Sequence, residues 1–157
     1  MTKSLSDVLA GQRWEKALFT TYSLSLTFFE SIVLRALREV ECREIWVVAD
    51  AEGYRSSLME RGSHGVGYEY HLVPVGLRNG VFHPKCCYLA GPDGDLLVVG
   101  SGNLTFGGFG RNLEDDSVVF AIGIGVGGDV ASLLEGDFVE VVLADVEFDA
   151  QVVQIGQ

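Results

Sequence analysis

The sequence is poor in the residues that cross-link or stiffen a fold. It holds three cysteines and three prolines in 157 residues. The number of cysteines is odd and Cys86 is adjacent to Cys87, so a disulfide framework is not expected and reduced thiols are predicted. No Cys-x-x-Cys or His-x-x-x-His pattern occurs, so nothing predicts a structural zinc site.

Basic residues are also scarce. Lys and Arg number 11 against 22 Asp and Glu, which gives a formal net charge of −11. This balance argues against broad electrostatic adhesion to nucleic acid, because phosphate contacts need local Lys and Arg. A small basic cleft is still compatible with it, because the local field rather than the total charge steers a ligand.

Long apolar runs are missing too. None reaches the roughly 20 residues that span a bilayer, and the polar N-terminal residues 1–16 lack the apolar core of a signal peptide. We therefore expect a cytoplasmic protein that does not bind a membrane. A chain of 157 residues suits one domain, residues 1–157, with an apolar core of its own.

What is present is a mixture of strand and helix patterns. Helical spacing of Phe28, Ile32, Leu34 or Leu37, and Val40 predicts an amphipathic helix over 26–42. A shorter helix is expected from residue 51 to about residue 62, and residues 128–144 begin as a helix and end as a strand in this interpretation. Strands are predicted at 15–25, 43–50, 67–76, 80–90, 95–102 and 112–123. The mixture predicts an α/β fold with a mixed central sheet covered by helices.

One stretch gathers the polar residues that suggest chemistry. His83 and Lys85 stand two apart on one predicted strand, and Ser101 and Asn103 stand two apart at the end of the next. The sequence Gly-Pro-Asp-Gly at 91–94 is typical of a turn that joins the two strands as a hairpin. Because residues i and i+2 share one face of a strand, we expect the two pairs to lie close together.

These side chains have a common chemical use at a phosphate group. A Lys ammonium suits a phosphate oxygen, and Ser and Asn donate hydrogen bonds to its other oxygens. A His can attack phosphorus or transfer a proton, and a carboxylate such as Glu114 could hold its second ring nitrogen. A His-x-Lys pair alone is commonly structural, so the hypothesis depends on the whole set in this order.

The pattern His83-x-Lys85, then Gly-Ser-Gly-Asn at 100–103, then Glu114, resembles the HKD motif of the phospholipase D superfamily, in the spacing of its bacterial endonucleases with one motif per chain. The resemblance implies an α/β/α sandwich, a homodimer that joins two motifs, and no metal or other cofactor. It implies that His83 is the nucleophile in one subunit and the general acid in the other. Lys85, Asn103 and Ser101 match the phosphate-binding positions, and Glu114 matches the carboxylate that orients the His. The Asp of the motif is replaced by Ala90.

The implied function is a metal-independent phosphodiesterase, most directly a nuclease that cleaves DNA or RNA through a phosphohistidine intermediate. The alternative is a catalytically degenerate module that binds phosphate or nucleic acid, or serves assembly, in a larger defence or restriction system. The acidic charge and Ala90 favour that alternative. Single-motif nucleases are often attached to helicase or recognition domains, so a partner protein of that kind is expected beside the nucleic acid.

Four further features have two interpretations each. Asp50 and Glu52 lie at a predicted strand end, where a solvated loop is favoured over a site role. Tyr68 and Tyr70 share one strand face, where packing is favoured over base stacking. Glu30 interrupts the apolar face of the first helix, either as a surface or dimer contact or as a site residue. The glycine-rich residues 105–110 either approach a ligand, which is favoured, or make a tight turn.

Overall fold

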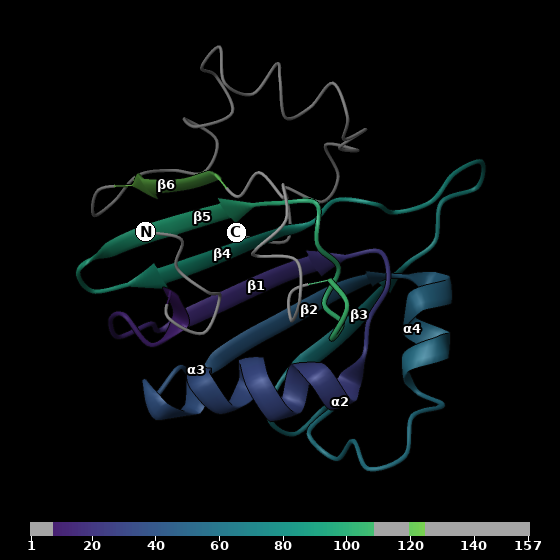
Figure 1. The fold of residues 1–157 in the computed structure, drawn as a ribbon, viewed down its shortest axis with the longest axis horizontal. Coiled ribbons are helices and arrows are strands. Elements are labelled where there is room, and N and C mark those ends of the chain that lie inside the picture. The colour runs from purple at the N-terminus through teal and green to yellow at the C-terminus, as the bar shows by residue number, and fades with distance from the viewer. Residues whose placement is uncertain (1–7, 109–119, 125–157) are drawn as a thin grey trace. The chain divides into compact units, whose positions relative to one another are not determined.

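The computed structural model describes residues 8–108 and 120–124, all of which belong to one compact unit, Met1–Val126 (Figure 1). The expected single domain over 1–157 extends beyond these residues and stays a prediction. The elements, in chain order, are β1 (Lys16–Thr21), α2 (Leu26–Phe28), the π-helix η1 (Phe29–Leu34), α3 (Arg35–Glu39), β2 (Glu44–Asp50), α4 (Ala51–Ser57), β3 (His71–Val75), β4 (Cys86–Gly91), β5 (Gly94–Val99) and β6 (Phe120–Ile124).

The six strands form one mixed sheet in the order β3-β2-β1-β4-β5-β6. Strands β1, β2 and β3 are parallel, whereas β4, β5 and β6 each run antiparallel to the neighbour that precedes them in this order. The predicted α/β class with a mixed central sheet is therefore confirmed, and so is the hairpin of β4 and β5. Pro74 lies in β3, an edge strand, where the missing N–H of proline is tolerated.

The helix predicted over 26–42 is present as a continuous helical run from α2 through η1 to α3. Ser25 begins it, because its side chain accepts a hydrogen bond from the backbone N–H of Phe28. The π-helical segment inserts an extra residue into the turn, which rotates the apolar face. Phe29 and Val33 are buried as a result, whereas Ile32 is 39% exposed. The prediction that Ile32 belongs to the buried face is therefore wrong.

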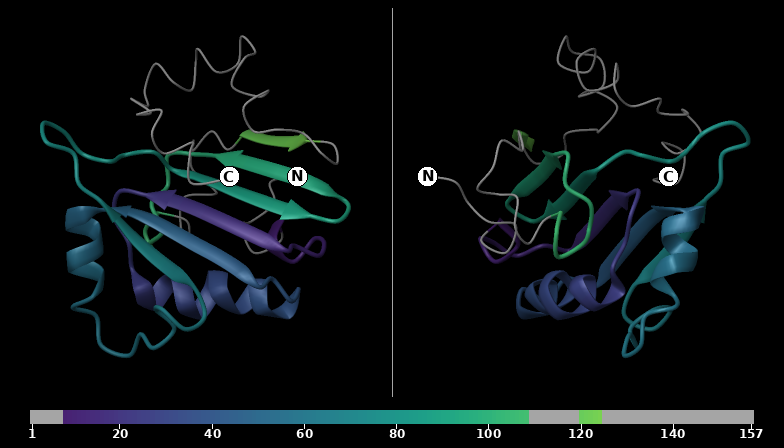
Figure 2. Two further views of the ribbon diagram at one scale, coloured as in Figure 1. Left: turned by 180° about the vertical axis from the view of Figure 1, so that it is seen from behind. Right: turned by 45° about the vertical axis from the view of Figure 1, so that its right-hand side comes forward.

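The helical run packs along one side of the sheet (Figure 2). Phe29 meets Phe19 of β1 edge-on, with ring centroids 5.6 Å apart, in the middle of the apolar core. The crossovers from β1 to β2 and from β2 to β3 move in the same direction, so right-handed connections place α4 on that same side. The second helical layer of a sandwich is not seen among the described elements, and residues 128–144 lie outside them.

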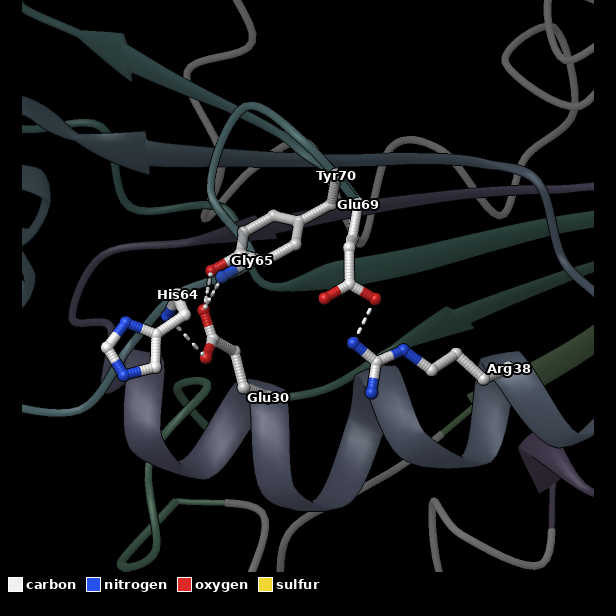
Figure 3. A network of polar contacts seen from close by, with 6 residues as sticks. All are labelled: Glu30, Arg38, His64, Gly65, Glu69 and Tyr70. Atoms are coloured by element: carbon white, nitrogen blue, oxygen red, sulfur yellow. Dashed lines mark hydrogen bonds and ion pairs between the residues drawn. The ribbon is translucent and has the colours of Figure 1, made fainter.

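Glu30 fixes the long loop before β3 to this helical run (Figure 3). Its carboxylate accepts hydrogen bonds from the backbone N–H groups of His64 and Gly65, both at 3.0 Å, and from the Tyr70 hydroxyl at 2.9 Å. Burial, together with this hydrogen bond to a carboxylate, raises the pKa of Tyr70 well above its usual range. Glu30 is thus a structural residue. The packing interpretation is confirmed for Tyr70, which is 2% exposed, and wrong for Tyr68, which is 93% exposed. Both residues precede β3 instead of sharing a strand face.

The described helices include none with the length and apolar character needed to cross a membrane.

Candidate phosphate site

Three segments of the chain meet at one end of the sheet. The end of β1 lies beside the start of β4, where Thr20 is the partner of Cys86, and the end of β5 lies on the other side of Cys86, where its partner is Val99. In Figure 1 this is the right-hand end of the sheet, where the arrowheads of β1 and β5 lie. The turns that leave these strand ends carry the polar residues singled out in the sequence.

His83 and Lys85 are in contact at this end. The Lys85 Nζ lies 2.9 Å from Nδ1 and 3.0 Å from Nε2 of His83, and it donates to the His83 carbonyl at 3.2 Å. The His83 side chain is exposed, whereas Lys85 is 9% exposed. Burial lowers the pKa of Lys85. The buried ammonium is therefore held beside the exposed imidazole, and a bound anion would relieve its burial penalty.

Both residues precede β4 instead of lying on it, so the predicted strand over 80–90 is wrong in its first half. Pro84 separates them, and a proline has no N–H to add to a strand ladder. The segment is also held from outside the sheet. Asp50 at the end of β2 accepts a hydrogen bond from the backbone N–H of Phe82 at 2.8 Å. Its other oxygen accepts from Glu52 N–H at 2.9 Å and caps α4.

Asp50 is thus a positioning residue that sequence reasoning missed. It is 6% exposed, so the favoured interpretation of a solvated loop is wrong. Its two carboxylate oxygens tie the start of α4 to the residue immediately before His83. The signal available in the sequence was its place directly after a buried strand, at the carboxyl end where ligand sites of α/β sheets gather.

Asn103 is held by the end of β1. Its Oδ1 accepts a hydrogen bond from the backbone N–H of Ser23 at 3.1 Å and lies 3.4 Å from the Thr21 hydroxyl. Because a backbone N–H can only donate, this contact identifies the amide oxygen. The amide NH₂ has no partner among the described residues. The oxygen is therefore used for anchoring, which leaves the two amide hydrogens to donate to a ligand.

Ser101 lies in the same turn, after the end of β5. The backbone N–H of Gly100, the residue before it, donates to the Lys85 carbonyl at 3.1 Å. Ser101 is exposed, and no hydrogen bond joins its side chain to His83, Lys85 or Asn103 in the described part of the chain. The turn thus brings Ser101 to the same sheet end, while its hydroxyl stays directed to solvent or ligand.

Tyr22 is a second residue that sequence reasoning missed. It follows β1 directly, and its ring centroid lies 5.2 Å from that of His83 at an interplanar angle of 45°. The half-buried phenol ring therefore limits the orientations that the exposed imidazole can adopt. Tyr22 and Ser23 are consecutive, so one turn contacts both His83 and Asn103.

No protein-family model matches this chain, and no curated protein does. Among solved structures the chain is similar to NucT from Helicobacter pylori, with 17% sequence identity and a TM-score of 0.47. The match covers 90% of this chain and 86% of that one. At this level of similarity, function has to be inferred from the site itself.

The remaining residue of the predicted set, Glu114, lies outside the described residues. The described chain resumes at Phe120, whose partner Val99 ends β5 at the same end of the sheet. The proposed contact between Glu114 and His83 therefore stays a prediction.

Ala90, which stands where the resemblance to the HKD motif would place an Asp, lies toward the other end of β4. It pairs with Lys16 at the start of β1 and with Asp95 near the start of β5. Five residues of strand separate it from Lys85, a distance of roughly 16 Å. A carboxylate at this position would not reach the imidazole of His83, so its loss leaves the polar cluster unchanged.

Proposed function

We propose that this chain is a metal-independent phosphodiesterase of the phospholipase D type, a nuclease that cleaves DNA or RNA at a homodimeric active site. The observation that supports it most is the contact of Lys85 with both ring nitrogens of His83 at the sheet end where Asn103 presents its amide hydrogens. A nucleophile, a cation and a fixed donor at one exposed point are the requirements of phosphoryl transfer.

The reaction follows from these roles. A ring nitrogen of His83 attacks phosphorus, a nitrogen–phosphorus bond forms, and the bond from phosphorus to the leaving oxygen breaks. His83 of the partner subunit gives its proton to that oxygen. Water then attacks the phosphohistidine, loses a proton to the same second imidazole and regenerates His83. Lys85 neutralises the developing negative charge, Asn103 and Ser101 donate hydrogen bonds to the phosphate oxygens, and Glu114 orients the imidazole.

The need for two chains comes from the histidine count. The sequence has three histidines. His64 belongs to the loop that Glu30 fixes. His71 begins β3 and pairs with Trp46 near the start of β2, whereas Asp50 is the last residue of β2. Neither lies near His83, so one chain supplies one imidazole to a reaction that uses two. An isologous dimer supplies the second.

A second candidate function is a binding module of a larger defence or restriction system, recruited by a helicase or recognition protein. The net charge of −11 favours it, because an acidic protein gains little non-specific affinity for nucleic acid and needs a partner to bring the substrate. Ala90 no longer favours it, because that residue lies far from the cluster.

Subunit mixing tests the shared site. Wild type and His83→Ala are unfolded together, refolded at several ratios and assayed in EDTA with a labelled oligonucleotide. A site that needs both His83 residues gives activity that falls as the square of the wild-type fraction. Activity that falls linearly with the wild-type fraction contradicts the shared site. As a control, the same mixing with His64→Ala in place of His83→Ala should leave activity unchanged. If the wild type itself cleaves nothing, phosphate binding by the intact protein supports the binding module instead.

A further inference from the structure

Phe106 is an exposed aromatic residue in the turn that carries Asn103. Its side chain is 52% exposed, although aromatic side chains of this size gain free energy by burial. The ring is not loose, because it meets the buried ring of Phe28 edge-on at a centroid distance of 5.2 Å and an angle of 76°. One part of the ring is therefore fixed to the helical run, and the rest is presented to solvent.

The turn holds Phe106 close to the candidate phosphate site. Thr105 N–H donates to the Asn103 carbonyl at 2.8 Å, and Gly108 N–H donates to the Thr105 carbonyl at 3.2 Å and hydroxyl at 3.0 Å. Gly108 packs so closely that an added Cβ would lie 2.1 Å from the Asn103 carbonyl oxygen. Three residues place the Phe106 Cα at most about 11 Å from that of Asn103. A nucleotide bound at Asn103 thus has this ring within reach of its neighbouring base.

A second aromatic ring lies at the cluster itself. Tyr22 lies against His83, and Ser23, the next residue, anchors Asn103. An aromatic ring therefore contacts His83, and the turn that carries Asn103 also carries Phe106. Rings that flank a track of phosphate contacts stack on the bases of a single strand, whereas the bases of a duplex are already stacked and paired.

The net charge of the protein also favours recognition by stacking. With 22 acidic against 11 basic residues, attraction for the phosphate backbone supplies little affinity. Stacking is independent of net charge, and it recognises any base because every base has a π-face. An acidic protein that acts on nucleic acid is thus expected to use its exposed rings.

We propose that Phe106, together with Tyr22, stacks the unpaired bases next to the bound phosphate, so that the site takes single-stranded nucleic acid. This inference rests on the proposed phosphodiesterase function. It deepens that function by naming the substrate class and a residue that determines specificity.

The test compares two single-stranded oligonucleotides of equal length, one with bases and one with abasic positions around the scissile phosphate. Wild type in EDTA should cleave the strand with bases with a kcat/KM about 5- to 150-fold higher than the abasic strand, the range expected for stacking of one base. Phe106→Ala should lose most of this preference, and Phe106→Trp should keep it. Tyr68→Ala removes a 93% exposed ring before β3, away from the site, and should keep the preference as well.

Each other result decides against the stacking role. If Phe106→Ala lowers cleavage of both strands equally, the inference is overturned, because Phe106 would then only support Asn103. An unchanged preference, or a Phe106→Ala variant that becomes monomeric, also overturns the inference. If the wild type cleaves neither strand, the phosphodiesterase fails, and fluorescence anisotropy of the same two strands then tests stacking alone. In that anisotropy measurement, equal affinities of the wild type for both strands would overturn the stacking role.

Discussion

Asp50 offers a test of how the segment that carries His83 is held. Its carboxylate is buried and has two separate uses, the cap of α4 and the acceptor for Phe82 N–H. In Asp50→Asn the single amide oxygen can keep the cap, but no acceptor is left for Phe82. Losing a buried hydrogen bond to a charged group costs about 1.5–3 kcal/mol. Asp50→Ala also loses the cap, about 1 kcal/mol more.

Urea unfolding measures the stability part of this prediction, and the midpoint should fall by on the order of 1 M for Asp50→Asn and further for Asp50→Ala. The catalytic part is a loss in kcat of at least about tenfold, with little change in KM, because a displaced nucleophile lowers the rate more than the binding. Ser25→Ala is the matched control, since it removes the cap of α2 without touching the segment before β4.

The reasoning is refuted if Asp50→Asn unfolds and cleaves like the wild type. It is also refuted if Ser25→Ala lowers kcat as much as Asp50→Asn, because a general loss of helix stability would then explain both results.

Three further predictions concern the same fold. Burial lowers the pKa of Lys85 below its ordinary 10.5. Between the lowered pKa and 10.5, the Lys85 side chain is therefore protonated in the unfolded state and largely neutral in the folded state. The free energy of unfolding should therefore rise with pH from the lowered pKa up to 10.5. Hydrolysis should fall over the same range, because the proposed role of Lys85 needs the ammonium. In urea titrations, Lys85→Met should remove the rise in the free energy of unfolding. Gly108→Ala, whose Cβ would meet the Asn103 backbone, should lower kcat/KM at least about tenfold, whereas Gly107→Ala, with open space around it, should not change it. Tyr70→Phe should lower the free energy of unfolding in urea by about 1–2 kcal/mol without changing hydrolysis, because it removes one buried hydrogen bond to Glu30.

The sequence predicted the sheet well where the signal is local. The apolar runs at β1 and β2 and the Gly-Pro-Asp-Gly turn are each contained within a few residues, and all were placed correctly. The helical run was predicted too, but its π-helical middle was not. No short pattern marks the inserted residue, so the buried face was assigned to Ile32 instead of Phe29.

The sequence identified the residues of the candidate site better than it predicted their geometry. His83 and Lys85 were expected on a strand, because the prediction extended that strand over the whole of 80–90. The strand begins only at Cys86, after Pro84 and after the contact of Asp50 with Phe82, which joins residues 32 positions apart. The roles of Asp50 and Tyr22 arise from such tertiary contacts, which one sequence does not reveal. Glu114 lies outside the described residues, so its expected role is open to experiment.

The central claim is that His83 performs phosphodiester chemistry. The most direct measurement is hydrolysis of a single-stranded oligonucleotide in EDTA by wild type, His83→Ala, His64→Ala and His71→Ala, each with its mass in solution determined. The account predicts dimers throughout, with cleavage lost only in His83→Ala. Cleavage that survives the loss of His83, or a folded wild-type dimer that cleaves no phosphodiester, would contradict it.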